Sequence, residues 1–230
     1  MKPLPHTQAP AWPLLAWLSA ALAGVAAPVL AMLWLAGASP TASLAGVTGP
    51  IMALGLMGVA MIAAAVSGRL WIGVGLALMT GAGLVGLAIT LGLPALPHPL
   101  SAGLAIMIAS VSFAARGALF ARSGLDKGWL IALFVVAGEA AVLLTAAAQP
   151  ETLPDWLLVL LPAQWASTAI QATLTGAGAR AASASLIALG GTAAATLLVV
   201  WLWPRRSTYL IMFTAWLGLS ALVWQTQAVA

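Results

Sequence analysis

Residues 151–176, "ETLPDWLLVLLPAQWASTAIQATLTG", decide the fold, because they are the one stretch between long apolar segments that does not read plainly as a membrane span. Two carboxylates and Pro154 come before six apolar residues, 156–161, and Pro162 ends this apolar run. A run with regularly spaced polar residues follows. The segment crosses a membrane, dips into it, or forms a loop, and this choice fixes the topology of everything after it.

The two arms of this segment differ in length and polarity. The first arm, residues 156–161, is about 9 Å of helix at 1.5 Å per residue, too short to span, and Pro162 then breaks the helix. In the second arm a polar stripe would be costly against lipid, although a full crossing that faces a cavity can carry one. We predict a re-entrant helical hairpin over about 155–176, with a full crossing as the alternative. The stripe consists of Gln164, Ser167, Thr168, Gln171 and Thr175.

The composition predicts an integral membrane protein. The chain has 230 residues, of which 63% are hydrophobic and 5% charged, and its mean hydropathy is +1.10. A soluble domain carries about 25% charged residues, and apolar stretches of about 20 residues indicate transmembrane helices. We therefore expect an all-α, polytopic bundle forming a single transmembrane domain over 1–230, with seven spans and a kink at Pro28. The expected spans are about 12–37, 44–67, 70–91, 100–121, 128–148, 181–203 and 208–225.

The basic residues predict orientation rather than nucleic-acid binding. The net charge is +4, but the eight Lys and Arg occur one to three at a time between apolar segments, as positive-inside signals do. With a re-entrant hairpin, seven of them are cytoplasmic and Arg180 is outside; with a full crossing the division is six to two. We predict a multi-pass protein of the inner (plasma) membrane with a cytoplasmic N-terminus and the C-terminus outside. The apolar run 11–37 is too long for a signal-peptide core and is interpreted as the first span.

Several kinds of chemistry lack the residues they need. The chain has no Cys, and its two His residues, His6 and His98, lie in a tail and a Pro-rich turn. No metal site, haem or other cofactor is therefore expected. No Gly-x-x-x-x-Gly-Lys-Ser/Thr motif for nucleotide binding occurs. Because no catalytic constellation can be assembled inside the bundle, an enzyme is not expected.

Glu139 is the only acidic residue inside an expected span. An ionisable group at such depth is a functional candidate, as proton relay, substrate contact or ion pair; the other interpretation is a protonated Glu bonded to a backbone carbonyl. Arg116 is the natural partner, but a symmetric hairpin places it opposite Phe134, about 7 Å short of Glu139. We therefore expect Arg116 to extend toward the surface.

A family resemblance follows from the order of residues in the deciding segment. Pro150, Leu153-Pro154-Asp155-Trp156-Leu157, Pro162, Trp165 and Gly176 follow one another as in the external hairpin of type-2 ABC exporter permeases. The run "SFAARGALFARSG" (112–124) is similar to the fourth span of that family, so the resemblance covers about 100–206. It implies a helical hairpin before span six and energy from a separate ATPase subunit. The chain departs from the family in its short N-terminus, in the turn Ser67-Gly68-Arg69 where a coupling helix stands, and in its seventh span.

Two functions remain open from the sequence. The first is a permease-like subunit of a multi-subunit membrane complex such as an ABC-type exporter; the alternative is a non-catalytic scaffold or assembly subunit. The expected partners are the lipid bilayer, other membrane subunits in a homo- or hetero-oligomer, and a separate ATPase subunit, without nucleic acid. The candidate functional residues are Glu139, Arg116, Trp156, Trp165, Gln164 and Gln171.

Overall fold

The computed structural model describes residues 12–38, 41–94, 96–149, 152–202 and 207–228. Several expectations fall outside these described residues: the basic residue at position 2, His6, the turn at 39–40, Pro150, the closing basic turn at 204–206, and the last two residues.

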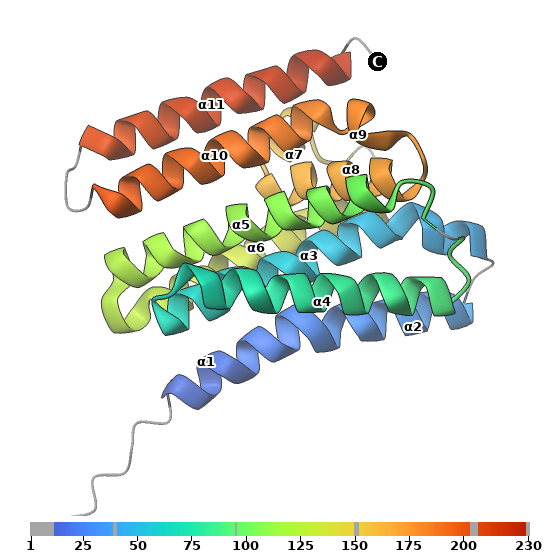
Figure 1. Ribbon diagram of the computed structural model, residues 1–230, viewed down its shortest axis with the longest axis horizontal. Coiled ribbons are helices and arrows are strands. Elements are labelled where there is room, and N and C mark those ends of the chain that lie inside the picture. Colours follow the sequence, from blue (N-terminus) through green and yellow to red (C-terminus); the bar gives the residue numbers. More distant parts are fainter. Residues whose placement is uncertain (1–11, 39–40, 95, 150–151, 203–206, 229–230) are drawn as a thin grey trace, which may run out of the picture.

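The described chain is entirely helical, and seven of its helices are long and apolar enough to cross a membrane. This confirms the expected all-helical, polytopic membrane fold, and the long helices run side by side as one bundle (Figure 1). Short helices separate the fifth and sixth long ones. The elements are α1 (Trp12–Ala21), a π-helical turn (Leu22–Ala26), α2 (Ala27–Ala38), α3 (Thr41–Ser67), α4 (Leu70–Thr90), α5 (Pro99–Gly124), a 3-10 turn (Leu125–Lys127), α6 (Gly128–Ala148), α7 (Asp155–Val159), α8 (Pro162–Leu174), α9 (Gly178–Ala181), α10 (Ser183–Trp201) and α11 (Ser207–Ala228).

The first span is one continuous run of α1, the π-helical turn and α2. Pro28 has no N–H to donate to the carbonyl of Gly24, so the regular ladder is interrupted there. The backbone responds one turn earlier: the N–H of Ala27 bonds to the carbonyl of Leu22, five residues back. The irregularity expected at Pro28 is therefore a π-helical turn at Leu22–Ala26.

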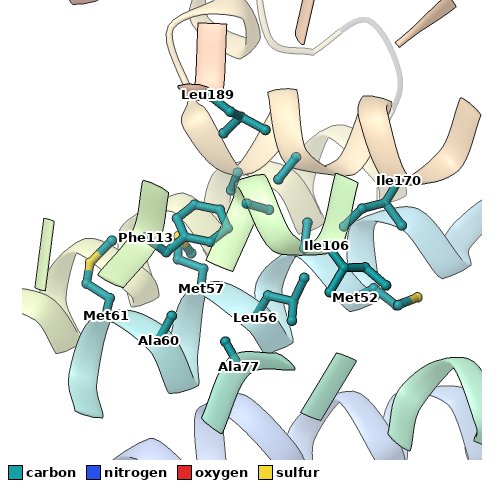
Figure 2. Close-up of a cluster of buried hydrophobic side chains, with 14 of the residues drawn as sticks. Met52, Leu56, Met57, Ala60, Met61, Ala77, Ile106, Phe113, Ile170 and Leu189 are labelled. Atoms are coloured by element: carbon teal, nitrogen blue, oxygen red, sulfur yellow. The ribbon is translucent and has the colours of Figure 1, made fainter. Parts of the chain in front are cut away.

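α3 is the central helix. In its membrane-spanning window, 83% of the residues are buried, and α1, α4, α5, α6 and α8 all pack around it. Figure 2 shows the core that results: Met52, Leu56 and Met57 of α3 lie among side chains from the surrounding helices. These neighbours include Ala77 of α4 and Phe113 of α5.

Three glycines bring the neighbouring helices against the backbone of α3. A Cβ added at Gly24 would lie 2.5 Å from Cβ of Val59, and one at Gly73 would lie 2.5 Å from the carbonyl oxygen of Ala60. A Cβ at Gly117 would collide with the carbonyl oxygen of Met61. Such close approach between membrane helices requires residues without side chains.

The bundle has two chemically distinct ends. At one, which we call the basic end, Arg69 lies in the turn after α3, Arg122 in the last turn of α5 and Lys127 in the 3-10 turn that follows. At the other, the proline end, α4 and α5 are joined through a turn that contains Pro97. The turn after α8 lies at the proline end, because a Cβ on Gly176 (φ +87°) would be 3.3 Å from Cγ of Pro97.

Candidate functional site

Glu139 lies in the middle of α6 and touches the start of another helix. It is the twelfth of the 21 residues of α6 and only 9% exposed. Its Oε2 accepts a hydrogen bond of 2.9 Å from the backbone N–H of Ala163, the second residue of α8. The carboxylate therefore sits at the N-terminal end of α8, where free N–H groups and the helix dipole favour a negative charge.

The local sequence of α8 leaves this position open for Glu139. Pro162 is the first residue of α8, where its missing N–H costs nothing. The preceding residue, Leu161, is extended and has an apolar side chain that cannot cap the helix. The cap that a Ser or Asp directly before the helix would normally supply comes instead from Glu139 of α6.

Arg116 of α5 lies close enough to Glu139 for the two charges to interact electrostatically. Its guanidinium carbon lies 5.7 Å from the centre of the Phe113 ring. Its Nη2 atom is buried and has no hydrogen-bond partner among the described residues. The expectation that Arg116 extends to the surface is wrong: its guanidinium is directed back along α5 and away from the basic end.

The direction of helical side chains explains how Arg116 comes near Glu139. Side chains on a helix lean toward its N-terminus. α5 runs toward the basic end and α6 runs away from it, so Arg116 leans away from the basic end while Glu139 leans toward it. These opposite leans close the offset of about 7 Å that the positions along the two helices predict.

Gln171 joins α8 to α3. Its Oε1 accepts a 2.8 Å hydrogen bond from the backbone N–H of Gly49, next to Pro50 of α3. The two backbones approach closely there, since a Cβ on Gly49 would lie 2.8 Å from the carbonyl oxygen of Ser167. The polar stripe predicted for this helix thus faces α3 at Gln171, and Gln164 of the same stripe is half-buried.

The two candidate tryptophans have different environments. Trp165 is 1% exposed, and its Nε1 donates a 2.7 Å hydrogen bond to the carbonyl oxygen of Val159 at the end of α7. Trp156, on α7, is 57% exposed. Trp216 of α11 donates a 3.2 Å hydrogen bond from Nε1 to the carbonyl oxygen of Leu160. Two indoles therefore satisfy carbonyl groups that the short α7 leaves without helical partners.

The structure brings Glu139, Arg116 and the first turn of α8 together into one site, with Gln171 and Trp165 fixing α8 from other sides. It leaves Trp156 and Gln164 out of this group. Sequence reasoning missed Phe113 and Trp216. The spacing of Phe113, three residues before Arg116 on the same helix face, is a signal that finds the first; no pattern connects Trp216 with a carbonyl 56 residues away.

The arrangement places a carboxyl group and a guanidinium group near each other inside an apolar bundle. The Glu139 carboxylate can accept hydrogen bonds or a proton, and the Arg116 guanidinium can donate. Within the described residues no three His, Asp or Glu side chains are grouped so as to hold a metal ion.

Comparison with known proteins found no matching family model, no matching curated protein and no matching solved structure.

Proposed function

We propose that this chain is the permease-like membrane subunit of a multi-subunit complex, an ABC-type exporter, in which α7 and α8 form a re-entrant hairpin. The observation that carries the proposal is the hydrogen bond between Ala163 and Glu139, which joins the start of α8 to the middle of a spanning helix. The other end of α8 lies beside Pro97 at the proline end.

Depth along the helices supports the hairpin. Glu139 is nine residues before the end of α6, which is about 14 Å at 1.5 Å per residue. The 13 residues of α8 are about 20 Å long, enough to return from that depth to the proline end. The hydrocarbon core of a bilayer is about 30 Å thick. Under the proposal, α8 begins near the middle of the membrane.

A half-helix that begins at this depth is an arrangement that transporters use. Their substrate and ion sites lie at the ends of discontinuous helices near the bilayer midplane, beside ionisable groups. In this chain the Ala163–Glu139 hydrogen bond holds α8 against α6, and Arg116 of α5 interacts with the same side chain of Glu139. A movement that separates α8 from α6 would free the carboxylate, the guanidinium and the first N–H groups of α8 to bind a substrate or a proton.

Single cysteines test the hairpin, because the native chain contains none. Thr152 and Arg180 are exposed residues before and after the hairpin. An impermeant maleimide should label both Thr152→Cys and Arg180→Cys from outside intact cells. Ser123→Cys, exposed at the basic end, is the control and should label only after the cells are opened. Labelling of positions 152 and 180 from opposite sides would mean that α7 and α8 cross the membrane together.

Partner identification tests the function. The tagged chain should be extracted from its native membrane in a mild detergent and its partners identified by mass spectrometry. An ATPase subunit in stoichiometric amount, with hydrolysis that changes in Glu139→Gln while the complex stays assembled, is the expected result. A stable complex without a nucleotide-binding chain would refute the exporter.

One observation favours the scaffold alternative: α3 is enclosed by helices that touch its backbone, so the centre of the bundle is packed. A scaffold would also bind partner subunits through α11, because only 11% of the residues in the membrane-spanning window of α11 are buried. Deleting the gene should then lower the amounts of the partner subunits and leave their specific activity unchanged. Reconstituted export by this chain and an ATPase would exclude that alternative.

A further inference from the structure

A hollow opens at the basic end of the bundle, away from Glu139. Its volume is about 900 Å³, at the upper end of the ~300–1,000 Å³ typical of sites for small molecules. It lies between the first residues of α1, the end of α3 and the start of α6. Its lining is mostly apolar, with Asp126 and Lys127 as the charged members; the apolar part includes Pro13, Ala16, Val66 and Leu130.

The path of the first span creates this hollow. α1 slants away from the other helices toward the basic end, whereas α2 lies along α4 (Figure 1). The π-helical turn at Leu22–Ala26 separates these two directions. Before that turn in the chain, Ala16 and Ala20 of α1 are still buried, but the first turn of α1 leaves room beside α6.

The charged groups of the hollow are available for a ligand. Asp126 and Lys127 are both exposed, and among the described residues neither side chain has a hydrogen bond or an ion pair. They are consecutive residues of the 3-10 turn between α5 and α6. The hollow thus combines an apolar wall along the spans with one carboxylate and one ammonium group at the end of the bundle.

We propose that this hollow binds one phospholipid whose zwitterionic head group carries a primary amine, of the phosphatidylethanolamine type. The ammonium of Lys127 pairs with the lipid phosphate, and the carboxylate of Asp126 accepts hydrogen bonds from the lipid amine. The acyl chains lie against the apolar wall formed by residues such as Ala16 and Leu130. Cationic side chains between spanning helices are a known means of holding lipid head groups.

The charges select among lipid classes. An anionic lipid such as phosphatidylglycerol would pair with Lys127 but place its negative charge beside Asp126 without an amine to neutralise that residue. A choline head group would supply a positive charge to Asp126 but no N–H to donate. Only a primary amine gives both the charge and the hydrogen bonds.

A lipid-retention experiment tests the proposal on the full chain. The delipidated protein is reconstituted in nanodiscs of equal parts phosphatidylethanolamine, phosphatidylcholine and phosphatidylglycerol, re-extracted gently, and its bound lipid counted by native mass spectrometry. We expect about one phosphatidylethanolamine per chain. Lys127→Ala and Asp126→Asn should each lower its retention by about fivefold, the factor that corresponds to one charge at a membrane surface. Arg122→Ala is the matched control, an exposed cation near the same turn that does not line the hollow.

A second readout needs no loss of charge. Ala121 lines the hollow, so the thiol of Ala121→Cys should react with a maleimide in the delipidated protein and be protected by phosphatidylethanolamine but not by phosphatidylcholine. The proposal is overturned if phosphatidylglycerol is retained preferentially, if Arg122→Ala loses as much lipid as Lys127→Ala, if all lipids protect position 121 equally, or if a polypeptide protects it instead.

Discussion

α3 and α6 have similar apolar character and opposite surroundings. Their membrane-spanning windows have mean hydropathies of 2.0 and 2.3, yet 83% of the window of α3 is buried and only 17% of that of α6. The slightly more apolar helix is the one that faces outward. Hydropathy therefore identifies a helix that can enter a membrane, but it does not say whether protein or lipid covers it.

The glycines of the two regions account for the difference. The helices around α3 present glycines to its backbone, whereas Gly138 of α6 has open space where a Cβ would stand. α6 packs inward along one narrow stripe, and Glu139 belongs to it. The buried residues of α6 are Gly128, Trp129, Ala132, Val136, Glu139 and Leu143.

The largest expected effect comes from a side chain forced against α3. In Gly117→Leu the new Cβ meets the carbonyl oxygen of Met61, and because backbone cannot yield as a side chain can, we expect more than about 3 kcal/mol of destabilisation. Gly138→Leu adds the same side chain to open space on α6 and should fold normally. Thermal unfolding in detergent, followed by size-exclusion chromatography, compares the two. Equal losses in both variants would mean that the close contacts with α3 do not decide stability.

Breaking the charge site tests the hydrogen bond that joins α6 to α8. Glu139→Leu removes the cap from Ala163 and leaves the Arg116 charge without its counterpart, and we expect a loss of about 2–4 kcal/mol. Glu139→Gln keeps an acceptor for Ala163 and should lose less. The double variant Glu139→Leu/Arg116→Leu should be more stable than the sum of its single losses, because no uncompensated charge remains.

The measurement for the charge site is a double-mutant cycle on unfolding midpoints, with assembly checked for each variant. Strictly additive losses would show that Arg116 and Glu139 do not stabilise one another. A Glu139→Gln variant that is as unstable as Glu139→Leu would show that the hydrogen bond to Ala163 contributes nothing.

A smaller effect is expected where α8 meets α3. Gln171→Leu leaves the N–H of Gly49 without its acceptor, and a buried unsatisfied donor costs about 1–3 kcal/mol. Gln164→Leu, a matched change on the same helix, should cost less. Denaturant midpoints of the two variants provide the test. A larger loss of stability in Gln164→Leu than in Gln171→Leu would show that Gln171 is not the residue that fixes α8 to α3.

The smallest effect is expected on α11, which is even less buried than α6. Trp216→Phe removes the donor to the carbonyl oxygen of Leu160, a partly buried bond worth about 1 kcal/mol. Trp224→Phe, at a position that is 44% exposed, should change stability by less than about 0.5 kcal/mol. The difference in unfolding midpoint between these two variants measures how firmly α11 is attached to α7.

Local features of the fold followed from the sequence, and contacts between distant segments did not. The seven long apolar helices and the break at Pro162 are properties of continuous segments, and the structure has them. The close packing around α3 uses glycines of neighbouring helices together with its own Gly55 and Gly58, and the hydropathy of the segment does not show which helices these glycines meet. Glu139 was found as an acidic residue in an apolar span, but its partner Ala163 is 24 residues away and donates through its backbone, which leaves no trace in residue type.

The π-helical turn at Leu22–Ala26 has a consequence for the angular phase of the first span. A residue of an α-helix advances about 100° around the axis, and a π-type turn accommodates one residue more than a regular turn does. It therefore offsets the azimuth of everything before it. Deleting one residue from this turn would let a regular helix re-form with residues 12–21 near their present azimuth. A regular helix that kept every residue would instead rotate residues 12–21 by about 100°, turning the inward side of Ala16 and Ala20 toward lipid. The π-helical turn thus sets the rotation of α1 relative to α2, so that each half of the first span turns its own buried side toward the bundle.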